Sequence, residues 1–138
     1  MLGARYRIIC FNNSGTSSNA SAGTTTVKRK GWYIDSTGKP IWEASPTTIF
    51  SNAGAITTGS YDTSDATSVD NAGATNPYIG AEFEFKFTAT GSPTGLVTFF
   101  LQRSTDGGTT WPDNGQGEVL CTIAPTAAAA YVSTTEYD

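Results

Sequence analysis

Two glutamates of this 138-residue chain stand at a spacing that could support acid–base chemistry. Glu82 and Glu84 are two residues apart, which in an extended strand separates their Cα atoms by about 6.6–6.8 Å. Paired carboxylates in glycoside hydrolases stand about 5–9.5 Å apart, so the distance permits that reaction. Lys86 continues the same strand face, however, and nothing in the sequence sets one glutamate apart as the acid. We therefore interpret these residues as a solvated strand face.

Oxygen-bearing side chains that could bind a calcium ion occur in the middle of the chain, at Asp62, Asp65, Asp70 and Asn71. Their spacing lacks the regular alternation of an EF-hand loop, so a plain polar loop is the simpler interpretation. The chain also contains no histidine, which excludes Ser-His-Asp and Cys-His catalysis and every metal site built on histidine. We predict that the protein is not an enzyme and that it uses no metal and no cofactor.

Four aromatic side chains, those of Trp32, Trp42, Tyr78 and Trp111, could stack on the apolar faces of sugar rings. A β-sandwich that carried them as one platform would be a carbohydrate-binding module. The alternative is that they pack in the core and around a hairpin. The sequence alone leaves both interpretations open.

The segment Ser104–Trp111 (STDGGTTW) matches the Asp-box pattern S-x-D-x-G-x-T-W at every fixed position. In such a turn the aspartate carboxylate accepts hydrogen bonds from turn amides, glycine tolerates a positive φ, and tryptophan anchors the turn to the sheet. A single copy in a chain this short does not indicate a sialidase propeller. The pattern predicts a structural hairpin formed by Ser104, Asp106, Gly108, Thr110 and Trp111.

Charge is distributed unevenly along the chain, which has a formal net charge of −4. Residues 1–40 contain six basic side chains and one acidic one, whereas residues 41–138 contain two basic and eleven acidic ones. This separation favours attraction within the chain or between copies. The run Lys28-Arg29-Lys30 alternates faces in a strand and no reader motif accompanies it, so we expect no nucleic-acid partner. The predicted contacts with protein partners are Lys28, Arg29, Lys30, Tyr61, Asp62, Asp65 and Asp70.

The composition favours β-strands joined by polar turns. Threonine and serine supply 36 of the 138 residues, and only 14% are charged. Apolar residues alternate most clearly over 81–90, where Phe83, Phe85 and Phe87 share one face, and again over 96–103. We expect these two strands to pair antiparallel and to supply the centre of the core. The other expected strands span 5–11, 24–35, 41–44, 118–124 and 131–135, with short ones at 47–50 and 55–58.

These elements predict an all-β single domain over residues 1–138, an antiparallel β-sandwich of jelly-roll-like form. Its parts are a basic N-terminal strand and hairpin (1–44), a polar loop expected to contact a neighbouring subunit (59–76), core strands (79–124) and a C-terminal tail (125–138). The chain stops without a turn, which predicts a closing strand that is missing or comes from another chain. The predicted core residues are Tyr6, Ile8, Trp32, Ile34, Trp42, Phe83, Phe85, Phe87, Val97, Phe99, Leu101, Val119 and Cys121.

The sequence also allows predictions about a disulfide bond, a membrane span and a signal peptide. Cys10 and Cys121 lie far apart in the sequence, and a bridge between them would require neighbouring strands, so we expect two buried free thiols. No apolar run approaches the ~20 residues of a membrane-spanning helix. None follows the N-terminus as a signal peptide would, so we expect a protein that is made and used in soluble form without Sec export, and we expect no membrane partner.

Four segments, taken together in their order and spacing, resemble small virion structural proteins of tailed bacteriophages. They are YRIICFNNSG, VKRKGWYIDSTGKPIWEAS, YIGAEFEFKF and LVTFFLQRSTDGGTTWPDNGQGEVL, which lie between residues 5 and 124. The resemblance implies a β-sandwich or jelly roll without cofactor or catalytic residue. Such proteins decorate capsids or build necks, tails and fibres as symmetric multimers.

The resemblance therefore predicts a structural component of the virion, a homo-oligomer that binds other proteins of the capsid, neck or tail. Hydroxyl-rich strands, scarce charge and long polar loops agree with a protein that is held by its neighbours. The alternative prediction is a carbohydrate- or host-surface-binding module.

Overall fold

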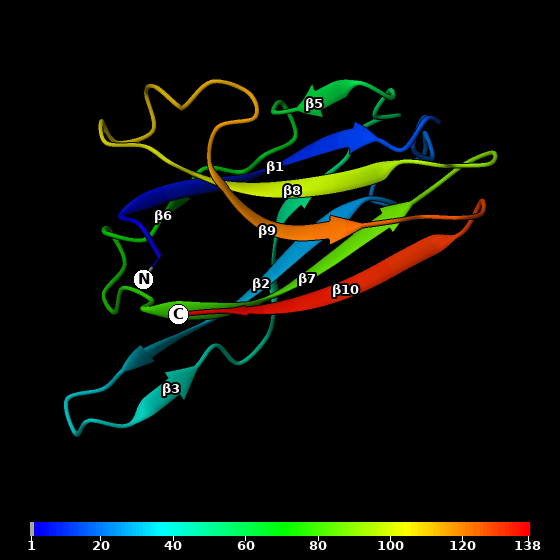
Figure 1. Cartoon of the computed structure of the whole chain (residues 1–138). Coiled ribbons are helices and arrows are strands. Elements are labelled where there is room, and N and C mark those ends of the chain that lie inside the picture. Colours follow the sequence, from blue (N-terminus) through cyan, green and yellow to red (C-terminus); the bar gives the residue numbers. More distant parts are fainter. Residues whose placement is uncertain (1) are drawn as a thin grey trace.

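The computed structural model describes residues 2–138, and in that range the regular secondary structure is all β. Ten strands follow one another along the chain, and Figure 1 shows them as two layers. They are β1 (Arg5–Asn13), β2 (Thr26–Ile34), β3 (Pro40–Trp42), β4 (Thr47–Ser51), β5 (Ser60–Asp62), β6 (Val69–Asp70), β7 (Gly80–Thr88), β8 (Leu96–Arg103), β9 (Glu118–Ile123) and β10 (Ala130–Tyr137).

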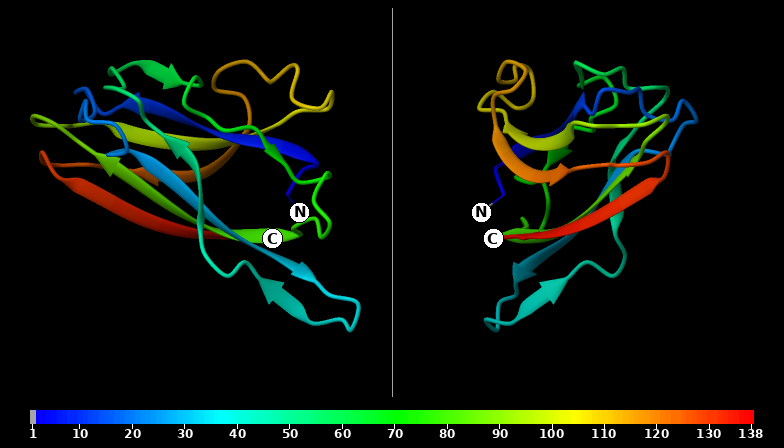
Figure 2. Two further views of the ribbon diagram at one scale, coloured as in Figure 1. Left: turned by 180° about the vertical axis from the view of Figure 1, so that it is seen from behind. Right: turned by 45° about the vertical axis from the view of Figure 1, so that its right-hand side comes forward.

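The strands form two antiparallel sheets that pack against each other (Figures 1 and 2). The first, here called the β1 sheet, has the order β5-β1-β8-β9, and β6 also pairs with β1. The second, the β7 sheet, has the order β10-β7-β2-β3, and β4 also pairs with β2. The prediction of an all-β antiparallel sandwich is therefore confirmed. No helix within residues 2–138 is long and apolar enough to cross a membrane.

The core lies between the sheets and consists of alternate residues of the long strands. The three phenylalanines of β7 are fully buried, and so are Val97, Phe99 and Leu101 of β8. The ring centroids of Phe85 and Phe99 are 5.0 Å apart across the sandwich. The period-2 pattern of these two segments therefore predicted their inner faces correctly.

The expected pairing of β7 with β8 is wrong, because the two strands lie in opposite sheets. Residues 89–95 cross from one sheet to the other instead of turning back as a hairpin. The backbone amides of Thr94 and Gly95 donate hydrogen bonds to the carbonyl of Ser14 at 2.8 and 3.0 Å. These bonds start β8 beside the end of β1, so the apolar face of β8 covers that of β7.

A β-bulge in β9 explains why Val119 is absent from the core. Cys121 lies opposite Phe99 and Val119 opposite Phe100, which leaves Leu120 as the extra residue. The insertion shifts the alternation by one position. Leu120 and Cys121 are buried as a result, whereas 56% of the Val119 surface is exposed.

The tip of the β2–β3 hairpin also differs from the predicted core. Strand β7 begins at Gly80, which is the partner of Trp32, so β2 continues past the end of the strand beside it. The hairpin projects from one end of the sandwich (Figure 1). Ile34 and Trp42 are 44% and 41% exposed, and Trp32 is half-buried. Alternation along β2 turns Trp32 and Ile34 to the outer face of the β7 sheet, away from the β1 sheet, and Trp42 is the strand partner of Trp32.

The polar segment 59–76 is partly strand, although the sequence suggests an unpaired loop. Strands β5 and β6 both pair with β1, and Ala66 forms a bridge to Phe50 of β4. The segment therefore closes one side of the sandwich between the two sheets. The expected strand at 55–58 does not form, although Ile56 within it is buried.

The C-terminal residues form the edge strand β10, in agreement with the expected strand at 131–135. It pairs with β7 over its full length, from Ala130 opposite Thr88 to Tyr137 opposite Ala81. Its side chains alternate between half-buried and exposed positions. The segment called a tail in the sequence analysis is thus a sheet member over most of its length.

Cys10 and Cys121 are free and buried, as expected. Both lie opposite Phe99, one on β1 and the other on β9, so that β8 runs between them. Two inter-strand spacings amount to roughly 9.6 Å, which exceeds the Cα separation of about 7 Å beyond which a disulfide cannot form.

We expect the two thiols to be inert in the folded protein. Burial, together with the charge of Asp62, raises the pKa of the Cys10 thiol far above its ordinary value, and burial also raises the pKa of Cys121. A thiol reagent such as DTNB should react with Cys10 only after denaturant is added, and a reductant should leave the melting temperature unchanged. Fast modification of Cys10 in the native protein would contradict this prediction.

Candidate functional site: the outer face of the β7 sheet and its projecting hairpin

The tip of the β2–β3 hairpin is held in one shape by Asp35. Its carboxylate accepts hydrogen bonds from the amide and hydroxyl of Thr37, at 2.8 and 2.7 Å, and from the amide of Lys39 at 2.9 Å. The bonds from Lys39 and Thr37 lower the pKa of Asp35 below its ordinary value. Gly38 supplies the positive φ of 81° that the turn requires. The projection is therefore a defined turn.

The base of the hairpin is fixed by a buried ion pair. The Arg29 guanidinium donates to Glu43 at 2.6 and 3.2 Å, and to the Tyr6 hydroxyl at 3.1 Å. Glu43 also accepts the backbone amide of Gly31 at 2.5 Å, and the Tyr78 ring lies 4.7 Å from the guanidinium. Arg29 is only 7% exposed, so the prediction that it contacts a partner is wrong. Alternation along β2 turns it inward, whereas Lys28 and Lys30 point outward.

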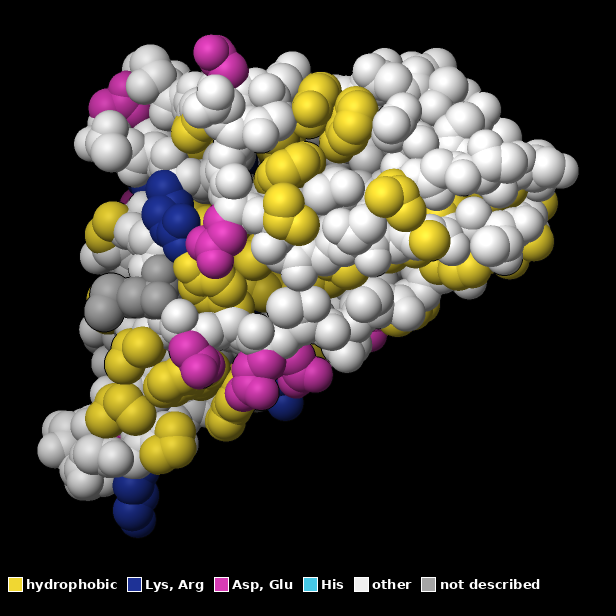
Figure 3. All heavy atoms as spheres, in the orientation of Figure 1, with side chains coloured by type: hydrophobic (Ala, Val, Ile, Leu, Met, Phe, Trp, Pro, Cys, Tyr) yellow, Lys and Arg dark blue, Asp and Glu magenta, His cyan; other side chains and the backbone are white. Residues whose placement is uncertain are grey.

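Several apolar side chains are exposed on the surface of the projection. Trp32 and Trp42 are opposite one another on β2 and β3, and their rings pack as a cross-strand pair with centroids 6.2 Å apart. Ile34, Ile41 and Trp42 are 44%, 37% and 41% exposed. Figure 3 shows hydrophobic side chains gathered over this hairpin, with acidic side chains on the neighbouring part of the sheet.

Next to the hairpin, charged side chains lie on the outer face of the β7 sheet, in rows that run across its strands. Lys30 of β2, Glu82 of β7 and Glu136 of β10 are neighbours in the register. In the next row Lys28 forms an ion pair with Glu84 at 3.5 Å, with both side chains 45% exposed. Glu82 and Glu84 therefore lie on a solvated face beside lysines.

A depression of about 310 Å³ lies where the charged face meets the hairpin, lined by Trp42, Glu82, Thr134, Thr135 and Glu136. Within residues 2–138, no hydrogen bond or ion pair engages the carboxylate of Glu82 or Glu136. An exposed indole beside carboxylates and a hydroxyl can hold the apolar face and hydroxyl groups of a sugar ring. Sequence patterns did not predict that Thr134, Thr135 and Glu136 belong to this site, because their position beside β7 depends on how the sheet is assembled.

The four aromatic residues considered as a sugar platform do not form one surface. Trp111 lies against Arg7 of the β1 sheet, with the guanidinium 4.6 Å from the ring centroid. Tyr78 lies over Arg29 at the base of the hairpin. Only Trp32 and Trp42 remain together, and their planes are tilted by 44°.

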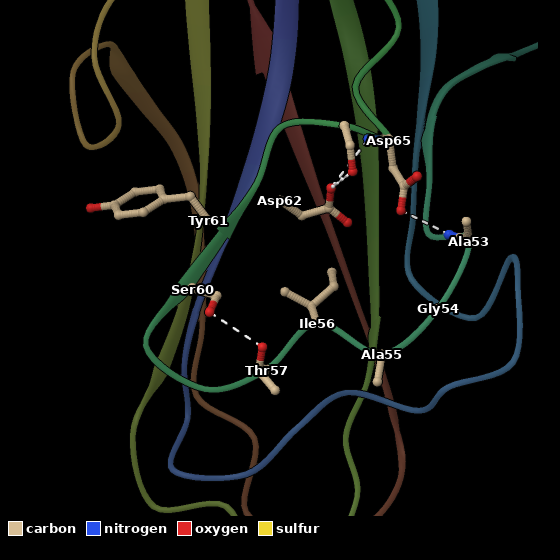
Figure 4. Close-up of a pocket in the computed structure, with 10 residues that line it drawn as sticks. Ala53, Gly54, Ala55, Ile56, Thr57, Ser60, Tyr61, Asp62 and Asp65 are labelled. Atoms are coloured by element: carbon tan, nitrogen blue, oxygen red, sulfur yellow. Dashed lines mark hydrogen bonds between the residues drawn. The ribbon is translucent and has the colours of Figure 1, made fainter.

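The acidic residues considered as calcium ligands separate into two places. Asp62 and Asp65 line a depression of about 300 Å³ (Figure 4). Burial, opposed by the bond from the Asp65 amide, raises the pKa of Asp62. Asp70 instead pairs with Arg5 at 2.7 Å, and Asn71 bonds the backbone of Tyr78. No three His, Cys, Asp or Glu side chains of residues 2–138 gather to hold a metal ion.

The predicted turn at Ser104–Trp111 is organised by one carboxylate. Asp106 accepts hydrogen bonds from the amides of Thr109 and Thr110, at 3.1 and 2.9 Å, and from the hydroxyl of Thr110 at 2.6 Å. The Ser104 hydroxyl bonds Asp106 at 2.7 Å and accepts the amide of Gly108 at 2.8 Å. Gly108 has a φ of 93°. These contacts agree with the hydrogen bonding expected of the pattern.

The turn belongs to a long connection, 104–117, and not to a tight hairpin between β8 and β9. Gln102, which is fully buried, holds this connection on the outer face of the β1 sheet. Its amide donates to the carbonyls of Pro112, Asp113 and Gln116, and its oxygen accepts the Arg7 side chain at 2.9 Å. The sequence gives one indication that Gln102 anchors this connection, namely a glutamine at an outward-facing position of a predicted strand.

We expect Asp106→Ala to loosen this turn and to lower the melting temperature at pH 7 by roughly 2–8 °C. Hydrogen bonds from Thr110 and Ser104 hold the pKa of Asp106 well below its usual range. The folded pKa lies below the unfolded value of about 3.9, so the contribution is complete above that pH and is lost as the pH falls further.

The difference in melting temperature between the wild type and the variant should therefore shrink as the pH is lowered toward about 2. Asp113→Ala is the matched control, because no hydrogen bond or ion pair of the Asp113 carboxylate occurs within residues 2–138. A difference that persists unchanged in acid would contradict the role of the ionised carboxylate.

The remaining predicted contact residues lie on separate surfaces. Lys28 and Lys30 lie on the outer face of the β7 sheet, next to the hairpin. Tyr61 lies on the other sheet, stacked on Phe11 with ring centroids 4.2 Å apart. Asp62, Asp65 and Asp70 follow along the edge next to β1. The structure thus does not gather the predicted contacts into one patch.

Comparison with protein-family models, with curated proteins and with solved structures gives no match for this chain.

Proposed function

We propose that the protein is a structural component of a bacteriophage virion, held by contacts with other capsid, neck or tail proteins in a symmetric assembly. The resemblance of the sequence to small virion proteins supports this proposal. The single observation that carries it is the projecting hairpin, on which the side chains of Ile34, Ile41 and Trp42 remain more than a third exposed.

The hairpin has the properties of a contact arm. An isolated two-stranded hairpin is marginally stable in water, and exposed side chains such as Ile34, Ile41 and Trp42 gain free energy when a neighbour covers them. The bonds of Asp35 and of the Arg29–Glu43 pair order the arm before it meets a partner. Preorganisation lowers the entropy lost on binding.

The proposal is tested on virus particles purified from host cells infected by the phage that carries this gene. We expect the protein to occur in a fixed ratio to the major capsid protein. A specific antibody should label it at symmetric positions in electron micrographs. Protein that remains wholly in the particle-free supernatant would contradict a virion role.

We expect the double variant Ile34→Ser, Ile41→Ser to remain folded but to enter particles more than about tenfold less than the wild type. Both side chains are already exposed, so the isolated protein loses little. Leu96→Ser is the matched control, because Leu96 is 50% exposed on the other sheet. Quantitative mass spectrometry of particles measures the effect, and equal incorporation of both variants would argue against the arm.

A carbohydrate-binding role is the second candidate, and the depression beside Trp42 favours it. A glycan array would then show a hit that Trp42→Ala abolishes. Trp111→Ala should retain the hit, because Trp111 lies on the other sheet against Arg7. A hit that survives Trp42→Ala would place sugar binding elsewhere on the protein.

A further inference from the structure

Strand β10 is a long sheet edge that lacks the usual protection against strand pairing. Strands β3, β5 and β6 have three, three and two residues, and β9 contains a bulge. By contrast β10 has eight residues in unbroken register with β7, and Glu136 is its one charged residue. It contains no proline or glycine. Edges of this kind accept a further strand.

The free side of β10 can be assigned from one backbone hydrogen bond. The carbonyl of Ala129 accepts the amide of Ala89 at 2.9 Å, so this carbonyl points toward the chain that continues β7. Backbone groups alternate direction along a strand. Those of Val132, Thr134 and Glu136 therefore point away from β7, where no strand of residues 2–138 pairs with them. Figures 1 and 2 show β10 along the margin of its sheet.

We propose that two copies of this chain pair through β10, antiparallel and about a two-fold axis at Thr134, to form one continuous sheet. This pairing would be one contact of the proposed virion assembly. Because its test uses the purified protein alone, the pairing and the virion role can fail separately. Thr134 then lies opposite its symmetry mate, and Val132 lies opposite Glu136 of the second copy. The outward backbone groups of both strands become paired.

Charge selects this register among those that the backbone allows. Glu82 and Glu136 form a row on one copy, and Val132 and Lys86 form a row on the other. The register joins these rows, so Lys86 faces Glu136 across Val132 at roughly 9.6 Å between Cα atoms. Two long side chains can span that distance. Within residues 2–138, no ion pair engages Lys86 or Glu136.

The same register also matches the side chains that lie on or near the edge. Val132, which is 61% exposed, is covered by the aliphatic part of Glu136 from the second copy. On the inner face, Tyr131 lies opposite Tyr137 of that copy, and aromatic cross-strand pairs stabilise antiparallel sheets. A shift by two residues in either direction would lose both matches and would place Glu136 opposite Ala130 or Thr134.

The test measures the mass of the purified protein by light scattering and sedimentation over a concentration series. We expect the wild type and Thr134→Ala to dimerise, because both keep the backbone amide at position 134. Thr134→Pro removes that amide from the free edge, where proline is tolerated, and should be a monomer with an unchanged circular dichroism spectrum. A wild-type monomer at every concentration, or a dimeric Thr134→Pro protein, overturns the proposal.

A charge exchange keeps the proposal testable if Thr134→Pro does not fold. Glu136→Lys should weaken the dimer by roughly tenfold, and Glu136→Lys combined with Lys86→Glu should restore it. Failure of the double variant to restore the dimer overturns the register. A dimer in solution together with absence from virus particles would refute the virion role and leave this pairing intact.

Discussion

Replacing Phe85 with alanine should lower the free energy of unfolding by about 3–5 kcal/mol, the range for removing a large aromatic side chain from a packed core. Phe85 is fully buried near the middle of β7. Its ring centroid lies 5.0 Å from that of Phe99 on the opposite sheet and 6.0 Å from that of Phe83 beside it. The loss is large because domains of this size are stable by only about 5–15 kcal/mol.

Urea unfolding followed by tryptophan fluorescence measures this effect, as a lower urea concentration at the unfolding midpoint with an unchanged dependence of the free energy on urea concentration. Phe100→Ala is the matched control, since Phe100 is next to Phe99 but half-buried on the outer face of the β1 sheet. We expect it to cost less than half as much as Phe85→Ala. Equal losses for the two variants would contradict the assignment of inner and outer faces.

The second large effect is expected at the base of the hairpin, where Glu43→Gln removes the charge that balances Arg29. The two side chains are only 13% and 8% exposed. Removing one partner of a buried ion pair costs about 3–5 kcal/mol, because the remaining charge is left without compensation. The amide of Gly31 also loses a charged acceptor.

Glu84→Gln separates this effect from that of an ordinary surface pair. Glu84 pairs with Lys28, and both side chains are 45% exposed, so the loss should stay within about 1 kcal/mol. Replacing Arg29 and Glu43 together with Met and Leu should recover much of the stability lost by Glu43→Gln. Equal effects of Glu43→Gln and Glu84→Gln would refute the buried pair.

Local patterns predicted the parts of this protein that depend on neighbours in the sequence. Alternation placed the phenylalanines of β7 inward, and β1 likewise buries Tyr6, Ile8 and Cys10. The turn at Asp106 forms the hydrogen bonds that its pattern implies. Side-chain direction within a strand and bonding within a turn are set over a few residues, so one segment is sufficient to reveal them.

Errors arose where a residue's environment depends on another strand. The bulge at Leu120 turns Val119 outward, and Ile34 lies on the outer face of β2, beyond the start of β7 at Gly80. Asn12 and Asn52, which the sequence patterns did not single out, are buried and bond backbone groups of Ile56 and Thr25. Asn71, considered as a calcium ligand, is buried and bonds the backbone of Tyr78.

The sequence by itself determined that the chain is built of strands and which faces of β1, β7 and β8 are apolar. Only the tertiary structure decided which strands are neighbours, and with that the site. It placed β7 and β8 in opposite sheets, turned Arg29 to Glu43 and brought β10 beside Glu82. The physical reason is that apolar alternation indicates only that one face of a strand must be buried. What buries it depends on hydrogen bonds between segments far apart in the chain.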